Sequence, residues 1–206
     1  MRVRLLLTLL WATTCVVSTH AAARSVEAQR NIFVINDDGT RIQITSAGTD
    51  SQPDLALDGT KVVFVRKINQ AEDELYLADV REPHTPLPLL KSPITIDGRR
   101  FNEIFAPKFS PDGASIYFLI RFTEAANAIA KVLLNRPAPR ILWQSALGFE
   151  VVKRGRYRGD VIANVRKAKL GYGYYDCFWL LSPEGKEIGV VAPDQRHVDF
   201  FLELQE

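Results

Sequence analysis

The fold is decided by residues 107–119, which read PKFSPDGASIYFL. In the turn Ser110-Pro111-Asp112-Gly113, proline suits the second position of a type I turn, aspartate the third, and glycine the left-handed fourth position. The run that begins at Ile116 carries apolar side chains on both faces of a strand. This pattern predicts an inner β-strand that is packed between two neighbouring sheets.

The same pattern repeats along the chain. Residues 53–65, PDLALDGTKVVFV, lie 54 positions earlier and share the proline, the Asp-Gly turn and four apolar positions in register. A degraded third copy at 159–167 keeps a Val-Arg-Lys ending but has lost the Asp-Gly turn. Residues 123–131 carry a weak helical signal and are expected to form a loop followed by a strand. The sequence therefore predicts an all-β repeat protein.

A second hairpin follows each copy of the repeat. These hairpins are predicted at 74–79 with 86–90, 129–132 with 140–143, and 178–181 with 188–191. A further hairpin, 32–35 with 41–45, comes before the first copy, and its own first half is missing. Units of four antiparallel strands that recur every ~40 to 50 residues are typical of β-propeller blades.

These residues resemble the TolB-like propeller repeats, whose blades combine an Asp-Gly turn after an apolar strand with a Pro-x-x-Ser-Pro-Asp-Gly segment. Residues 109–118 match this pattern closely, residues 32–39 match its first part, and residues 53–65 match with Leu57 in place of the turn proline. The resemblance implies a single TolB-like β-propeller domain over residues 24–206. It says little about function, because the matching residues are architectural.

The chain is short for this resemblance, since TolB-like propellers usually have six blades. The predicted strands number fifteen when one strand at 197–203 is included. We expect about four blades, with the C-terminal strand joining the N-terminal hairpin so that both chain ends close the ring. The alternative is an open array or one that is completed by oligomerisation.

The first residues have the features of a cleavable secretory signal. Two arginines precede the apolar run 5–17, which is shorter than the roughly 20 residues that a membrane span needs. Small residues follow up to Ala23. We expect residues 1–23 to be a signal peptide that is cleaved after Ala23, with cleavage after Ala28 as the alternative. The protein is then periplasmic or secreted.

Removal of this segment changes both the charge and the cysteine content. The whole chain has 26 basic and 24 acidic residues and a net charge of +2, so loss of the two arginines leaves a neutral mature chain. Cys15 leaves with the signal, and the residues before it do not favour a lipid anchor. Cys177 remains in an apolar stretch and is predicted to be a buried free thiol, without an intramolecular disulfide. We expect no stable membrane anchor.

Motifs for catalysis and for cofactors are absent from the sequence. It contains no Gly-x-Ser-x-Gly elbow, no His-Glu-x-x-His and no glycine-rich phosphate loop after a strand. We therefore predict no enzyme, no catalytic residue, no cofactor and no metal site. His197 and Asp199 would share one face of a strand, but no third ligand is identifiable. Acidic residues that could converge on a channel in a hydrolase lie at predicted strand starts: Asp50, Asp54, Glu103 and Asp160.

One segment is strongly basic within the otherwise neutral chain. Eight basic residues and only two acidic ones lie between Arg140 and Leu170. Their densest part replaces the compact turn of the other repeats. Arginine can pair with carboxylates or phosphates, and arginine and tyrosine are enriched at binding sites. The predicted binding residues are Lys153, Arg154, Arg156, Tyr157, Arg158, Tyr172 and Tyr174.

The sequence therefore predicts a secreted, non-enzymatic β-propeller that binds a protein or peptide of the cell envelope. Proteins that resemble TolB act as scaffolds there, and the resemblance implies such a role. The basic segment would also suit nucleic acid, but the secretory signal argues against that partner. Two alternatives stay open. One is a carbohydrate-active or other hydrolase that uses the channel, and the other is an incomplete propeller that works only as an oligomer.

Overall fold

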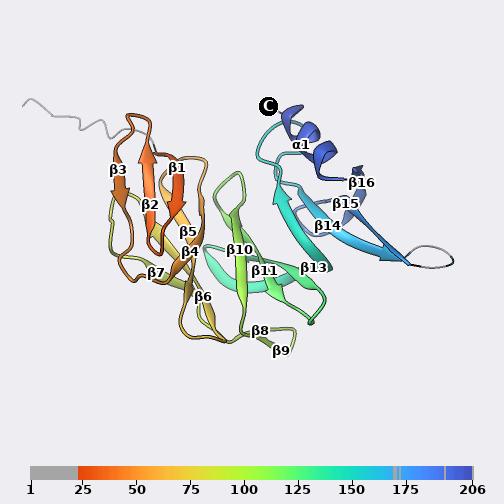
Figure 1. The fold of residues 1–206 in the computed structure, drawn as a ribbon, viewed down its shortest axis with the longest axis horizontal. Helices are drawn as coiled ribbons and strands as arrows, with labels where there is room; N and C mark the ends of the chain where they lie inside the picture. The colour runs from red at the N-terminus through yellow and green to blue at the C-terminus, as the bar shows by residue number, and fades with distance from the viewer. Residues whose placement is uncertain (1–22, 169–170, 172, 193, 206) are drawn as a thin grey trace, which may run out of the picture.

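The computed structural model describes residues 23–168, 171, 173–192 and 194–205, and shows antiparallel sheets that follow one another in chain order (Figure 1). The all-β prediction is confirmed, with one helix at the C-terminal end of the described chain. The first sheet has the order β1 (Ala23–Ala28), β2 (Ile32–Asn36) and β3 (Arg41–Gln43). The second sheet has the order β4 (Asp50–Leu55), β5 (Lys61–Lys67), β6 (Asp73–Asp79) and β7 (Leu87–Leu90).

The rest of the strands form one continuous seven-stranded sheet and a small hairpin. The large sheet runs through β10 (Ile104–Phe109), β11 (Ser115–Arg121), β12 (Asn127–Leu133), β13 (Arg136–Val151), β14 (Val161–Ala168), β15 (Tyr174–Leu181) and β16 (Glu187–Ala192). The hairpin consists of β8 (Ile94–Ile96) and β9 (Arg99–Phe101), and no repeat in the sequence predicted it. The loop at 123–126 and the strand β12 confirm the expectation for that segment.

The long strand β13 serves two groups of strands in turn. Its first part pairs with β12, its last part pairs with β14, and only Ala146 pairs with both. Ser145, just before this change of partner, has a left-handed backbone with φ of 63°. We call β10 to β12 with residues 136–144 the third sheet unit, and residues 146–151 with β14 to β16 the fourth sheet unit.

A bulge recurs in the inner strand of the second, third and fourth units. The register shifts between Ser51 and Asp54 in β4, between Phe105 and Lys108 in β10, and between Ala146 and Gly148 in β13. In β4 and β10 the bulged residue precedes a proline and has a positive φ, 51° at Gln52 and 49° at Ala106. A bulge bends its strand and turns a side chain away from the pleat. The degraded third repeat has therefore kept its bulge although it has lost its proline.

The turn that decides the fold forms as predicted. Gly113 has φ of 68° and donates its N–H to the Ser110 carbonyl, and the Asp112 carboxylate accepts the N–H of Ala114. The following strand β11 is buried along its whole length except for Arg121. The side chains on its two faces belong to two different hydrophobic cores, as expected for an inner strand packed between two layers.

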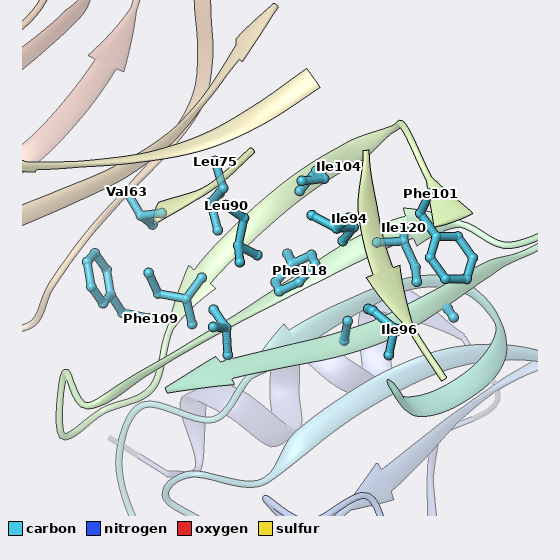
Figure 2. Close-up of a cluster of buried hydrophobic side chains, with 14 of the residues drawn as sticks. Val63, Leu75, Leu90, Ile94, Ile96, Phe101, Ile104, Phe109, Phe118 and Ile120 are labelled. Atoms are coloured by element: carbon cyan, nitrogen blue, oxygen red, sulfur yellow. The ribbon is translucent and has the colours of Figure 1, made fainter. Parts of the chain in front are cut away.

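The largest core lies between the second and third units (Figure 2). Val63 and Leu75 of the second sheet meet Phe109 and Phe118 of the third unit, and all four side chains are fully buried. The β8–β9 hairpin covers one end of this core with its buried apolar side chains, Ile94, Ile96 and Phe101. The opposite face of β11 uses Tyr117 and Leu119 to pack against the fourth unit. Packing of one unit on the next thus continues through the chain.

The C-terminal strand predicted at 197–203 is wrong. These residues belong to helix α1 (Gln195–Glu203), which the Asp194 carboxylate caps by accepting the N–H of His197. Val198 is fully buried and Phe201 and Leu202 are partly buried against the fourth unit. The spacing of these three positions is that of one helix face. The helix covers the face of the fourth unit that has no further sheet to pack against.

The ring closure that was predicted from this strand is also absent from the described residues. β1, and not a C-terminal strand, extends the N-terminal hairpin to three strands, and α1 lies at the other end of the arc in Figure 1. The described sheets do not close on one another. Residues 1–22 lie outside the described part of the chain, so the structure does not address the predicted signal peptide.

Candidate functional site

Polar side chains link the inner strands of three consecutive units. The Gln52 Oε1 accepts the N–H of Ala106 at 2.5 Å, and the Asp54 Oδ2 accepts the N–H of Phe109 at 2.7 Å. The Lys153 Nζ lies 2.9 Å from the Phe109 carbonyl oxygen and 3.4 Å from the Asp54 Oδ2. The Asp54 and Lys153 side chains are 15% and 29% exposed, so this contact is shielded from water. A charge-assisted link of this kind fixes how the inner strands lie relative to one another.

A hollow of about 350 Å³ opens beside this link, and we call it the inner-strand hollow. Apolar groups line it together with three cations, one acid and one amide: Leu57, Lys108, Glu150, Val151, Val152, Lys153, Arg154, Leu202 and Gln205. Leu57 is an apolar residue in a turn, and it is 50% exposed. Lys108 and Arg154 have no ion-pair partner among the described residues, whereas Lys153 is engaged by Asp54. The hollow therefore combines apolar surface with two cations, Lys108 and Arg154, and one acid, Glu150, none of which has an ion-pair partner among the described residues. Its unpaired charges sum to +1, so it can accept a carboxylate together with an apolar side chain.

The predicted basic site is divided by the structure. Lys153 and Arg154 line the inner-strand hollow. Arg158 donates to the Pro111 carbonyl oxygen at 3.0 Å and so ties the fourth unit to the third. Tyr157 packs on Phe201 of α1 with ring centroids 5.5 Å apart, and the Arg156 guanidinium lies over the Tyr157 ring. Most of the loop thus has a structural role.

The aromatic part of the predicted site does not join the basic part. Tyr174 is exposed, but it pairs with Ala168 at one end of the β14–β15 hairpin, whereas the basic loop adjoins Val161 at the other end. Tyr172 lies outside the described residues. The structure therefore does not bring Tyr174 and the basic loop together, because they lie at opposite ends of β14.

Glycine at position 155 explains why the basic loop replaces a compact turn. Gly155 has φ of 72°, and a Cβ there would lie 2.8 Å from the backbone oxygen of Gln205, just beyond α1. Only glycine allows so close an approach. The loop therefore packs against the end of the C-terminal helix. The amino-acid composition of the loop does not indicate this contact.

Of the lining residues, only Lys153 and Arg154 were predicted as functional, and those that were not include Leu57, Lys108 and Leu202. The sequence held a signal for the first, since Leu57 stands where the related turn has proline and leaves an apolar side chain in an exposed turn. Lys108 occupies the position of Asp54 in the 54-residue repeat, so one inner strand offers an acid where the next offers a base. Leu202 was assigned to a strand, and that error concealed its position.

The carboxylates considered for hydrolysis are engaged separately. Asp50 is buried and forms a two-pronged ion pair with Arg66, at 2.7 and 2.9 Å. Glu103 pairs with Arg121 at 3.3 Å. Burial, together with the nearby Glu184 carboxylate, raises the pKa of Asp160. His197 bonds Asp194 at 2.7 Å and lies on a helix, so it does not share a face with Asp199 as a strand would have required.

A second, smaller cleft of about 230 Å³ separates the third and fourth units near Tyr117 and Lys131. The Lys131 Nζ donates to the Pro183 carbonyl oxygen and lies 5.1 Å from the centre of the Tyr117 ring. Burial raises the pKa of Tyr117 to about 12, with a further contribution from Glu184. Burial and the neighbouring Arg140 lower the pKa of Lys131. The polar groups of this cleft hold the two units together.

The raised pKa of Tyr117 predicts a loss of stability at high pH. The folded state holds the phenolic proton more tightly than the unfolded state does, so the stabilisation is complete below pH 10 and is lost as pH rises from 10 towards 12. We expect the free energy of unfolding to fall more steeply over this range in the wild type than in Tyr117→Phe. Urea unfolding at a series of pH values measures both slopes. Equal slopes in the two proteins would contradict the assignment.

Within the described residues, no three histidine, cysteine or acidic side chains come together in a way that could hold a metal ion. The described chain also contains no helix of the length and hydrophobicity needed to cross a membrane. Cys177 is buried as predicted, and the Trp179 indole N–H points at its sulfur at 3.1 Å.

Solved structures share the arrangement of these sheets. TolB from Acinetobacter baumannii superposes with a TM-score of 0.55 at 15% identity, over 80% of this chain and 38% of that one. The chain has a TolB-like β-propeller fold. The β-propeller domain of the Trilobed protease from Pyrococcus furiosus, described as having an open velcro topology, gives 0.52 at 14% identity over 77% of this chain and 47% of that one. The tricorn protease gives 0.54 at 15% identity, over 82% and 15%.

These matches confirm the resemblance at the level of the fold. The propeller described here spans less than half the length of each of the three matched chains. Protein-family models give no match, and neither do curated protein sequences. Because the matched propellers belong both to TolB and to peptidases, the shared fold does not by itself choose a function.

Proposed function

We propose that this protein is a secreted or periplasmic, non-enzymatic propeller of about four blades that binds a protein or peptide of the cell envelope. The four blades are the first and second sheets and the third and fourth sheet units. The observation that carries the proposal is the inner-strand hollow, where Lys108 and Arg154 stand without ion-pair partners beside the exposed Leu57. A ligand segment with one acidic and one apolar side chain would satisfy both features.

Secretion is part of this proposal and rests on the N-terminal sequence. The signal peptide is proposed to end at Ala23, where β1 begins. Cleavage at the alternative position, after Ala28, would remove β1 and leave Ile32 and Val34 of β2 with one neighbour strand fewer. Cleavage after Ala23 removes only the first residue of β1 and leaves the rest of the described fold.

Reversal of charge in the hollow is the direct test. We expect Lys108→Glu with Arg154→Glu to reduce capture of the envelope partner by immobilised mature protein by ~10-fold or more, because two attractive contacts become repulsive. Quantitative pull-down from an envelope extract, followed by titration of the captured partner, measures the effect. Circular dichroism establishes that the variant is folded.

Arg156→Glu provides a matched control in the same loop. Its guanidinium lies over Tyr157 and outside the hollow, so the variant changes net charge equally per residue but should leave capture within about twofold of the wild type. If Arg156→Glu impairs capture as strongly as Arg154→Glu, the loop as a whole and not the hollow recognises the partner. Undiminished capture by the double variant would refute the proposed site.

The hydrolase alternative has less support, because three of the four carboxylates named for it are each paired with a basic side chain: Asp50 with Arg66, Asp54 with Lys153, and Glu103 with Arg121. Turnover of polysaccharides and esters remains a simple assay for it. The oligomer alternative concerns the two ends of the row of sheets. The first sheet ends in β1, which pairs only with β2 among the described residues, whereas the fourth unit is covered by α1.

A further inference from the structure

Within the described part of the chain, the first sheet has no counterpart of the innermost strand of the other units. β2 leads into the turn at 36–40 just as β6 leads into its own turn, which makes β1 the counterpart of β5 and leaves no counterpart of β4. Among the described residues, β1 pairs only with β2, so its other edge is unpaired. β1 also contacts β4 of the second sheet. A strand edge of this kind presents unpaired backbone N–H and C=O groups.

The missing strand would meet a specific set of hydrogen-bond donors on β4. In the next pair of units, side chains of β4 accept the backbone N–H groups of Ala106 and Phe109 in β10. The repeat of 54 residues places Gln52 and Leu55 at the equivalent positions of β4. The equivalence is supported by the next residue, because Ala56 N–H bonds Lys61 as Ser110 N–H bonds Ser115. Neither Gln52 N–H nor Leu55 N–H has a side-chain acceptor among the described residues.

An open hollow marks the place where such a strand would begin. It has a volume of about 610 Å³ and lies between the end of β1, the start of β4 and the loop after β5, where its lining includes Ala28, Arg30, Gly48, Thr49, Lys67 and Ile68. Arg30 has no ion-pair partner among the described residues, whereas Lys67 pairs with Asp73 at 3.6 Å at the surface. The one acid in the lining, Asp50, is neutralised by Arg66. The mouth of the hollow is therefore positive.

We propose that the free edge of β1 binds an extended acidic peptide strand from a partner protein. The strand runs antiparallel to β1 and alongside β4, with an acidic residue near Arg30. It carries a glutamine or asparagine and then an aspartate two residues later, which accept the Gln52 and Leu55 N–H groups as Gln52 and Asp54 do for β10. This site is separate from the inner-strand hollow and does not depend on the function proposed there.

The asymmetry of the two ends argues for a peptide and against a second copy. A head-to-tail contact between copies would place the first sheet of one molecule on the fourth unit of the next. That face of the fourth unit is already covered by α1 through Val198 and Phe201. Backbone pairing supplies affinity in strand addition, and side-chain acceptors supply specificity. At the N-terminal end of the described chain, the free edge of β1 offers the backbone pairing, and the Gln52 and Leu55 N–H groups offer the donors that the peptide's acceptors would meet.

The chain itself provides a suitable probe. A labelled synthetic peptide with the sequence of residues 49–57, TDSQPDLAL, carries the acid, the glutamine and the aspartate at the required spacing. We expect saturable binding to the mature protein by fluorescence anisotropy. The control peptide TDSAPALAL lacks the two acceptors and should bind at least ~10-fold more weakly, because the bound peptide would cover two N–H groups without giving them partners. Hydrogen exchange should slow in β1 and β4 when the probe is bound.

Two variants of the protein locate the site. Arg30→Glu reverses the charge at the mouth and should weaken probe binding ~5 to 10-fold, whereas Arg99→Glu, in the β8–β9 hairpin over Phe122, should not. No saturable binding, equal binding of the two peptides, or protection confined to the inner-strand hollow would each overturn the proposal. A dimer in light scattering whose β1 amides are protected without any peptide would assign the edge to a second copy instead.

Discussion

Val198→Asp is expected to detach α1 from the fourth sheet unit and to lower the free energy of unfolding by at least about 3 kcal/mol. Val198 is fully buried among Val152, Ile162 and Phe178, so the variant loses the burial of one aliphatic side chain and must also desolvate a carboxylate or release the helix. In a chain of this size, 3 kcal/mol corresponds to a fall in melting temperature of roughly 6 to 12 °C. Thermal unfolding followed by circular dichroism measures it.

A matched control lies two residues further along the same helix. Phe200 is 59% exposed on the opposite side of α1, and Phe200→Asp should change the free energy of unfolding by no more than about 0.5 kcal/mol. Release of the helix should also uncover apolar surface on the fourth unit, so Val198→Asp should bind the dye ANS while Phe200→Asp should not. A melting temperature for Val198→Asp within 1 °C of the wild type would show that α1 contributes nothing to the fold.

The helix was predictable from the sequence, and the repeat pattern led the prediction away from it. Asp194 stands three residues before His197, and apolar side chains at Val198, Phe201 and Leu202 follow with helical spacing. The expectation of a closed ring demanded one more strand, and the segment was assigned to it. The helical spacing of the apolar residues indicated the correct structure, whereas the analogy with complete propellers favoured a strand.

The sequence predicted well whatever is determined by residues close together in the chain. The turn at 110–113 and the predicted hairpins formed, because proline, aspartate and glycine impose their backbone angles locally. The β8–β9 hairpin was missed because it belongs to no repeat, although Asp97-Gly98 is by itself a turn signal typical of hairpins. β1 was missed because its residues lay next to the predicted signal and show no marked alternation.

The functional side chains were harder to predict, because the contacts that occupy a basic residue come from distant parts of the chain. Arg158 and Lys153 looked equivalent to Arg154 in the sequence. In the structure, Arg158 donates to the Pro111 carbonyl oxygen, 47 residues away in sequence. Lys153 pairs with the Asp54 carboxylate, 99 residues away. What remained for a ligand was Arg154 together with Lys108, which no local charge cluster had marked. Tertiary contacts thus select which members of a basic segment stay available.

Asp54→Ala is expected to destabilise the protein by about 2 to 4 kcal/mol, although Asp54 lies on the inner-strand side where a functional carboxylate was considered. Loss of the carboxylate leaves the buried Phe109 N–H without its acceptor and the partly buried Lys153 ammonium without its counter-ion. Urea unfolding measures the loss. Exchange of the Phe109 amide hydrogen should accelerate more than that of Phe118, whose strand is not touched by the change.

The double variant Asp54→Ala with Lys153→Met separates the two causes. If the uncompensated ammonium contributes to the loss, removing it should restore about 1 kcal/mol relative to Asp54→Ala, because a partly buried charge without a partner costs more than an apolar side chain of similar length. Glu150→Ala is the control, since Glu150 is exposed in the same hollow without an ion-pair partner among the described residues and should change stability by less than about 0.5 kcal/mol. Equal losses for Asp54→Ala and Glu150→Ala would mean that the inner strands are held by apolar packing alone, and that Asp54 is free to serve a ligand.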